Sequence, residues 1–184
     1  MRGGTIRLIV MTGAVFTTAV ALAGSGTTFN LFSLAFPNGK PIPTKYASAY
    51  VNGGKNISIP LSWSGIPEGT RSFALSVIDL HPAANNWVHW LVIDIPPTAE
   101  SLKEGSSGRN LPSGAKELYN SFGDLGYGGP GPPKGSGLHK YEVTLYALNV
   151  DTLDLTANAT LKAFRTVVDP HIAGIARLIG VYER

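Results

Sequence analysis

Histidine is scarce in this chain, so the places where it occurs are informative. The four copies are His81, His89, His139 and His171. His89 stands in the segment WVHW, and alternation along a strand puts Trp87, His89 and Leu91 on one face. An imidazole in such a place is either a core residue held by one hydrogen bond or part of the floor of a pocket.

A carboxylate and a rigid loop could complete such a pocket. Asp79 lies at the carboxyl end of an apolar strand, where a buried carboxylate needs a partner such as a histidine on the next strand. The segment GYGGPGPP, residues 126–133, combines glycines, which allow close backbone approach, with prolines, which restrict the backbone. We expect a rigid rim whose amide N–H groups point into a cavity, followed by His139 and Tyr141. A linker or a polyproline tract is the alternative interpretation.

Several catalytic chemistries find no support in the residues. The chain has no cysteine, which excludes disulfides, a thiolate nucleophile, a cysteine zinc site and a lipobox anchor. It has no GxSxG nucleophile elbow, and the GGK run at residues 53–55 lacks the spacing of a phosphate loop. One enzymatic alternative is a metal site formed by Asp79, His89 and His139, although their spacing is not diagnostic.

The elements that must position these residues are mostly strands. The segments bounded by Gly, Pro or Asn and rich in β-branched or aromatic residues predict strands at 28–36, 72–79, 87–95, 141–148 and 178–182. Asn85 and Asn86 would join the second and third of these as neighbours. Helical spacing predicts a helix over 159–168, and Asp169 before Pro170 predicts the N-cap of a second short helix. Residues 103–139 form a long irregular region, which is either disordered or functional.

Composition agrees with a single β-rich domain. The 184 residues include 22 Gly and 13 Pro, and only 15% are charged, which disfavours long helices, coiled coils and polyelectrolyte disorder. The fold class we predict is mainly β, a two-sheet antiparallel β-sandwich with short C-terminal helices.

The amino end has the features of a secretory signal peptide. Arg2 and Arg7 precede an apolar stretch that ends in small residues at Ala21–Ala23. We therefore expect a signal peptide at residues 1–23, a domain at 24–184, and a secreted or periplasmic location, with a membrane anchor as the alternative. The two arginines supply most of the net charge of +3, and no basic run remains to indicate nucleic-acid binding.

Four strings in the chain resemble the phosphatidylethanolamine-binding proteins, also called Raf kinase inhibitor proteins, in their bacterial and archaeal branch. The strings are ISIPLSWSGIPEGTRSFAL, WVHWLVIDIP, NSFGDLGYGGPGPPKGSGLHKYEVTLYAL and LIGVYER. The resemblance covers nearly the whole chain after the amino end. It implies a sandwich of two antiparallel sheets with a small pocket for phosphate, acetate or a phospholipid head group.

The resemblance also implies which residues bind the anion. They are Asp79, His89, His139 and Tyr141, with a wall formed by Gly128, Gly129 and Pro130. His171 matches a family histidine that we interpret as structural. Where the family usually has DPDAP, this chain has DLHPA, so His81 replaces an acid at the rim and would add to the attraction for an anion.

These features together favour a non-enzymatic binding protein, with a regulatory role implied by the resemblance. We expect no cofactor and no resident metal. The partner would be a small anion or a phospholipid head group, and the resemblance also implies a small homo-oligomer such as a homodimer. A second hypothesis is inhibition of a protease or another protein through surface loops.

Overall fold

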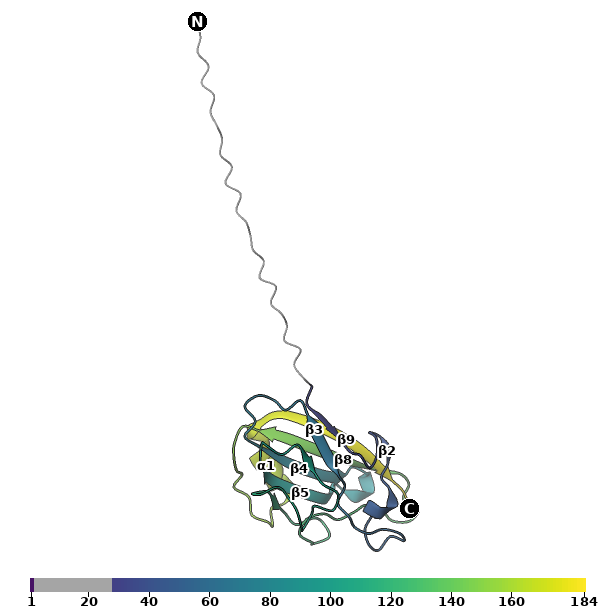
Figure 1. The fold of residues 1–184 in the computed structure, drawn as a ribbon. Helices are drawn as coiled ribbons and strands as arrows, with labels where there is room; N and C mark the ends of the chain where they lie inside the picture. The colour runs from purple at the N-terminus through teal and green to yellow at the C-terminus, as the bar shows by residue number, and fades with distance from the viewer. Residues whose placement is uncertain (2–27) are drawn as a thin grey trace.

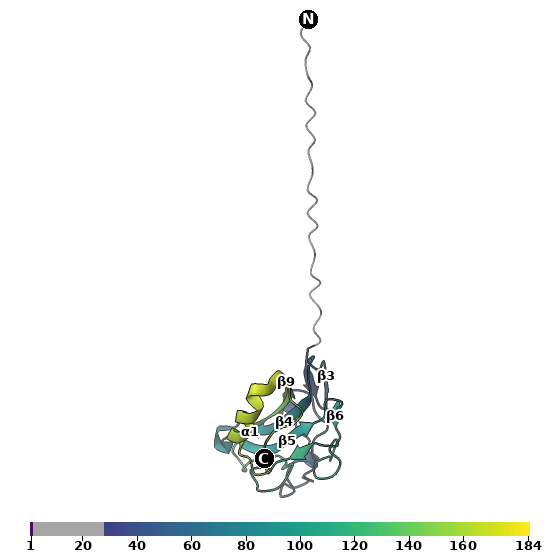
Figure 2. The same cartoon turned by 90° about the vertical axis from the view of Figure 1, so that its left-hand side faces the viewer.

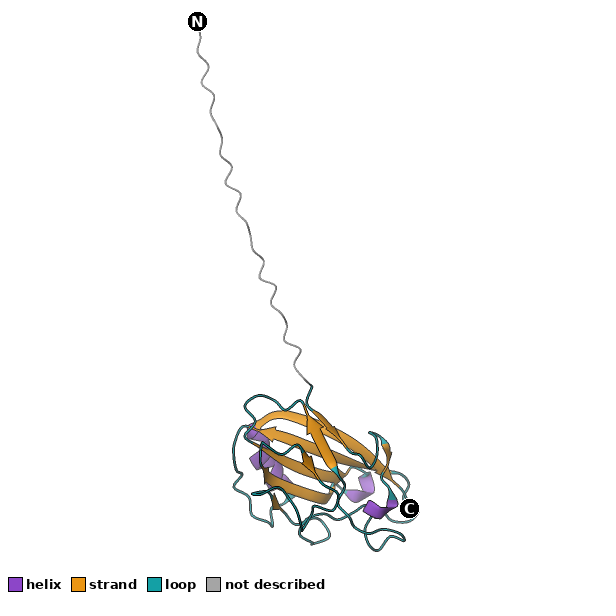
Figure 3. Cartoon of the chain, viewed as in Figure 1, coloured by secondary structure: helices purple, strands orange, loops and turns teal. Residues whose placement is uncertain are grey.

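The computed structural model describes Met1 and residues 28–184, so the expected signal peptide lies, apart from Met1, outside the described residues. Figures 1 and 3 show a β-sandwich with one short α-helix packed against its larger sheet. In the described part of the chain, no helix is both long enough and apolar enough to cross a bilayer.

Two sheets form the sandwich. The three-stranded sheet has the order β1-β3-β6, and the six-stranded sheet has the order β2-β9-β8-β4-β5-β7. The pairings are antiparallel except that of β2 with β9, which is parallel and two residues long. The bounds are β1 Asn30–Phe32, β2 Lys40–Pro41, β3 Leu61–Ser64, β4 Ser72–Asp79, β5 Trp87–Ile95, β6 Ser101–Leu102, β7 Lys116–Glu117, β8 His139–Leu148 and β9 Ile172–Tyr182.

The main core lies between the two sheets. Leu31 and Trp63 of the small sheet belong to one buried cluster with inward-facing residues of β4, β5 and β8. The opposite face of the large sheet carries a smaller cluster that includes Phe164 and Val168 of α1, Leu161–Val168. Figure 2 shows the helix on that side. The molecule therefore has three layers, and the large sheet is buried on both faces, as the wholly buried strand β4 illustrates.

The second and third predicted strands have the predicted bounds, and the fourth begins two residues earlier, at His139. Asn85 and Asn86 form the turn between β4 and β5, and both have positive φ, which asparagine tolerates better than most residues. Long apolar runs with clear turn residues at their ends were therefore sufficient to place the strands that carry the site.

Three predicted elements were wrong in extent. The first strand covers only Asn30–Phe32, because Ser33 turns the chain by bonding Pro60 O and accepting from Ala35 N. The second helix is a single 3-10 turn, η3 Asp169–His171, and Asp169 is the C-cap of α1 rather than an N-cap. The last strand begins at Ile172, because β9 pairs with β8 along that strand's whole length.

A β-bulge in β5 overturns the predicted common face of Trp87, His89 and Leu91. Val77 pairs with Trp90 whereas Ile78 pairs with Val88, so His89 is an extra residue on its strand. Leu91 consequently belongs to the cluster beneath α1, while Trp87 and His89 line a cavity at the end of the sheet. The bulge gives His89 its direction, and simple alternation could not reveal it.

Candidate functional site

A cavity of about 250 Å³ lies at the end of the large sheet where β4 ends and β8 begins. Asp79 is opposite Tyr141 in the register of these strands, and His89 lies on the next strand, so three strands bring the four predicted side chains together. The volume is slightly below the roughly 300–1,000 Å³ of sites for drug-sized ligands. The lining residues are Tyr50, Asp79, Ala83, Ala84, Trp87, His89, Phe122, Gly131, Pro132, Pro133, His139 and Tyr141.

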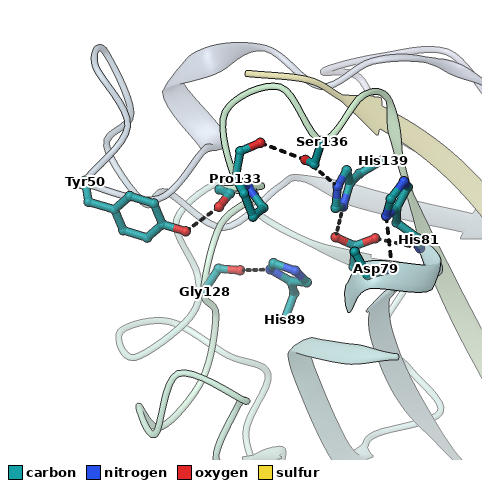
Figure 4. Close-up of polar contacts among 10 residues, drawn as sticks. Tyr50, Asp79, His81, His89, Gly128, Pro133, Ser136 and His139 are labelled. Carbon is teal, nitrogen blue, oxygen red and sulfur yellow. Dashed lines mark hydrogen bonds and ion pairs between the residues drawn. The ribbon is translucent and has the colours of Figure 1, made fainter. Parts of the chain in front are cut away.

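Asp79 and His139 form a buried pair at one side of this cavity (Figure 4). Asp79 Oδ2 lies 2.6 Å from His139 Nδ1, and Asp79 Oδ1 accepts a hydrogen bond of 2.9 Å from the His81 backbone N–H. The two side chains are 5% and 2% exposed, so the pairing satisfies groups that would be costly to bury alone. The expected partnership between a strand-end acid and a histidine on the adjacent strand is therefore present.

Ser136 completes a chain of hydrogen bonds that begins at Asp79. Its hydroxyl donates to Pro133 O at 2.7 Å, and its Oγ lies 2.9 Å from His139 Nε2. Both ring nitrogens of His139 thus have a protein partner, Asp79 at Nδ1 and Ser136 at Nε2. Neither ring nitrogen of His139 is therefore free to bind a ligand.

The order Ser136, His139, Asp79 is also the order of a serine-hydrolase triad. In a working triad the serine hydroxyl donates to the histidine, whereas here it donates to a proline carbonyl. Ser136 is also not among the residues that line the cavity. The arrangement therefore serves to tie the 133–139 loop to the sheet.

His81 stacks on His139 at the rim (Figure 4). The ring centroids are 3.9 Å apart and the ring planes differ by 16°. His81 Nδ1 accepts a hydrogen bond from Ala83 N at the start of η2, Pro82–Ala84, which leaves the ring hydrogen on Nε2 of a neutral imidazole. The rim position expected for His81 is thus adjacent to the cavity, but the side chain covers His139 instead of lining the cavity.

His89 is held by a backbone carbonyl of the opposite loop. Its Nδ1 lies 2.6 Å from Gly128 O, and the Gly128 N–H returns a hydrogen bond of 2.8 Å to His89 O. Burial lowers the pKa of His89 to about 4, so the ring is neutral at neutral pH. Since a carbonyl only accepts, the single ring hydrogen is on Nδ1.

Tyr141 is the one lining side chain that is both buried and unsatisfied. It is 1% exposed, and its hydroxyl has no hydrogen-bond partner in the described part of the chain. Burial raises its pKa most, and the neighbouring Asp79 carboxylate raises it further by its charge and by a weak hydrogen-bonding interaction that falls short of normal geometry, so the hydroxyl keeps its hydrogen. A buried hydroxyl without a partner is uncommon, and one facing a cavity indicates a place for a polar ligand atom.

The glycine loop differs from its predicted role. Gly128, Gly129 and Pro130 lie behind the cavity, whose wall is formed by residues 131–133. The Gly128 N–H bonds His89 O and the Gly129 N–H bonds Asn56 Oδ1, so neither amide is available to a ligand. A side chain on Gly129 would come within 2.2 Å of Tyr46 O, so this backbone is close-packed rather than open to the cavity.

The aromatic part of the lining was missed by sequence reasoning. Tyr50, Trp87 and Phe122 surround the mouth, with the Phe122 ring centroid 5.3 Å from that of Trp87 and 6.4 Å from that of Tyr50. Tyr50 donates to Gly131 O at 2.6 Å. Of these three residues, only Trp87 could have been predicted from the sequence, because it lies two residues before His89. Ser136 also escaped notice, although it is three residues before His139.

The metal alternative has little geometric support. In residues 28–184 and Met1, no three His, Cys, Asp or Glu side chains are grouped so as to hold a metal ion. Both ring nitrogens of His139 are engaged by protein groups, and His89 Nδ1 is bonded to Gly128. His171, interpreted as structural, lies in η3, and its carbonyl accepts from Asn149 N, away from the cavity lining.

Comparison with known proteins gives a consistent result. The family model described as phosphatidylethanolamine-binding protein matches residues 32–183. The UPF0098 protein of Aquifex aeolicus is 36% identical over 174 residues, which cover 95% of this chain and 99% of that protein. The UPF0098 protein of Methanothermobacter thermautotrophicus is 41% identical over 157 residues, covering 84% and 99%. The crystal structure of Escherichia coli YbcL, titled a new member of the mammalian PEBP family, is 33% identical with a TM-score of 0.79, covering 85% of this chain and 98% of YbcL.

Proposed function

The chain belongs to the phosphatidylethanolamine-binding protein family, and from that premise we propose that it is a non-enzymatic binding protein whose cavity takes a phosphate-like anion or phospholipid head group. The observation that carries this proposal is the unsatisfied hydroxyl of Tyr141, buried in the wall of a cavity of about 250 Å³. An oxygen of the ligand would accept its hydrogen. Such a bond, made where water is largely excluded, contributes more than the same bond at the surface.

The polar groups of the lining support binding rather than catalysis. The hydroxyl nearest to a histidine, that of Ser136, is already bonded to Pro133, and the imidazole of His139 is paired with Asp79. Neither group is placed to attack a substrate or to shuttle a proton within the cavity. Aromatic rings at the mouth provide contact area for the rest of a small ligand.

The test is a titration with inorganic phosphate and O-phosphoethanolamine, followed by two-dimensional NMR, on the wild type and on Tyr141→Phe. We expect shift changes at cavity residues and about a tenfold loss of affinity in the variant, which corresponds to one hydrogen bond of roughly 1.4 kcal/mol. Tyr127→Phe is the matched control, because the Tyr127 hydroxyl donates to Tyr46 O and is outside the cavity lining. Shift changes confined to other surfaces, or equal affinities for all three proteins, would contradict the proposal.

We also propose that residues 1–23 direct export of the folded domain. The support is the basic, apolar and small-residue order of the amino end. Intact-mass analysis of the protein from its native host should give a mature chain that begins near Gly24. A cytoplasmic chain that still begins at Met1 would contradict this part of the proposal.

A further inference from the structure

The free nitrogen of His89 can only accept a hydrogen bond. Its Nδ1 donates to Gly128 O, and the Nε2 on the other side of the ring has no partner in the described part of the chain (Figure 4). The neutral ring therefore presents a lone pair at Nε2. A fully ionised oxyanion offers only lone pairs in return, so the two would repel each other.

The rest of the lining does not supply the missing positive charge. None of the described residues that line the cavity is Lys or Arg, and the Asp79 carboxylate can only accept. Both ring nitrogens of His139 are already engaged, by Asp79 and by Ser136. Among residues 130–133 only Gly131 has an amide hydrogen, because the other three are prolines. Of the buried lining side chains, Tyr141 alone can donate to a ligand.

A ligand that matches this pattern has an acceptor oxygen and a hydroxyl hydrogen on the same small group. The acceptor would take the hydrogen of Tyr141, and the hydroxyl would donate to His89 Nε2. Hydrogenphosphate and phosphomonoester monoanions have both groups. Sulfate and phosphodiesters are ionised without any remaining acidic hydrogen, so one of their oxygens would face the His89 lone pair. Polar groups left unpaired inside a site are the usual reason why close analogues are rejected.

We propose that the cavity selects oxyacids that retain one acidic hydrogen, phosphate and phosphomonoesters foremost, over sulfate and phosphodiesters, because His89 Nε2 accepts that hydrogen. This inference rests on the proposed anion-binding function and specifies its ligand class. It also separates the two sources of a phosphoryl group, since a free phosphomonoester retains such a hydrogen and a diacyl phospholipid head group, which is a phosphodiester, does not.

The experiment compares four ligands on the wild-type protein by calorimetry between pH 6 and pH 8.5: phosphate, O-phosphoethanolamine, sulfate and dimethyl phosphate. At pH 6 we expect phosphate and O-phosphoethanolamine to bind at least about tenfold more tightly than sulfate or dimethyl phosphate. The affinity of O-phosphoethanolamine should fall as pH rises past the second ionisation of its phosphoryl group, near pH 6, because its dianion has no phosphoryl hydrogen left. Inorganic phosphate keeps one hydrogen as hydrogenphosphate and should not show this fall. Sulfate and dimethyl phosphate should show no such fall.

The outcomes separate this inference from the function on which it rests. Equal binding of phosphate and sulfate, or O-phosphoethanolamine binding that strengthens as its last phosphoryl hydrogen is lost, would overturn the selectivity and leave an anion pocket. Failure of all four ligands to bind would overturn the proposed function as well. Preference for dimethyl phosphate would indicate a phosphodiester, and therefore a lipid head group.

Variants add a second readout. In His89→Gln the side-chain amide can donate as well as accept, so the ratio of phosphate to sulfate affinity should fall towards one. Tyr127→Phe is the control, because Tyr127 is outside the cavity lining and its hydroxyl donates to Tyr46 O, so its loss should leave the ratio unchanged. Circular dichroism checks that each variant is folded. If His89→Gln does not fold, the ligand series on the wild type decides alone.

Discussion

Two buried carboxylates lie near opposite ends of the β4–β5 pair, and their surroundings differ. Asp79, at the end of β4, is paired with His139, whose side chain is 2% exposed. Asp94, near the end of β5, accepts from Leu153 N at 2.8 Å, and its other oxygen lies 3.0 Å from Lys116 Nζ, on a side chain that is 63% exposed. Each carboxylate is paired with a nitrogen-bearing side chain, but only the Asp79–His139 pair is removed from water as a whole.

The bulges at the two ends also differ in consequence. At the far end, Phe73 pairs with Ile95 and Leu75 with Val92, and Asp94 takes a positive φ of 56° so that its side chain can cap the Leu153 amide. At the pocket end, the bulge directs His89 towards a cavity. Both ends of the strand pair therefore have a buried acid beside a bulge, although only the end with the cavity is a candidate functional site. In the described part of the chain, the difference is that only the pocket end has a cavity, which is lined by His89 and by the unbonded hydroxyl of Tyr141.

The largest effect should come from acid, which acts on the pocket end through His89. Its pKa is about 4 in the folded protein and about 6.5 when unfolded, so below pH 6.5 the unfolded chain binds a proton that the folded chain excludes. The stabilisation is complete above pH 6.5 and is lost as pH falls to 4, a decrease in the free energy of unfolding of about 3 kcal/mol. Urea unfolding at several pH values measures it. Because His89→Gln lacks the titrating group, its curve should be flatter by that amount, and parallel curves would contradict the assignment.

The next effect contrasts the two carboxylates directly. Asp79→Asn removes the charge that faces the buried His139 and should lower the free energy of unfolding by about 2 kcal/mol. Asp94→Asn keeps an oxygen for Leu153 N and a residue that tolerates positive φ, so it loses only an ion pair with an exposed lysine, worth less than about 1 kcal/mol. Urea unfolding at pH 7 compares both variants with the wild type. Equal losses in the free energy of unfolding for the two variants would contradict the proposed difference between the two carboxylates.

The smallest effect concerns two buried tyrosines. Tyr127→Phe breaks a bond of 3.0 Å from the Tyr127 hydroxyl to Tyr46 O and should cost about 1 kcal/mol. Tyr141→Phe removes a hydroxyl that has no protein partner, so its stability should remain within about 0.5 kcal/mol of the wild type. Thermal unfolding of the two variants and the wild type under the same conditions measures both effects. A clear loss of stability in Tyr141→Phe would mean that its hydroxyl is bonded within the folded protein.

The sequence by itself determined the strands that carry the site and four of its side chains. Runs such as Ser72–Asp79 and Trp87–Ile95 are apolar, rich in β-branched and aromatic residues and closed by turn residues, so local composition is enough to define them. The pairing of Asp79 with a histidine also followed, because a buried carboxylate requires a partner and histidines are few. These properties depend on residue type and on near neighbours in the chain.

Only the tertiary structure decided what each polar group can offer to a ligand. The bulge at His89 depends on the register of β4 against β5, and the tautomer of its ring depends on Gly128, which is 39 residues away. The loop amides are bonded to His89 O and Asn56, and the mouth is formed by Tyr50 and Phe122 from other loops. A hydrogen bond between distant segments engages a donor or an acceptor without any sign in local composition. For that reason the Gly128 and Gly129 amides looked available to a ligand and are not.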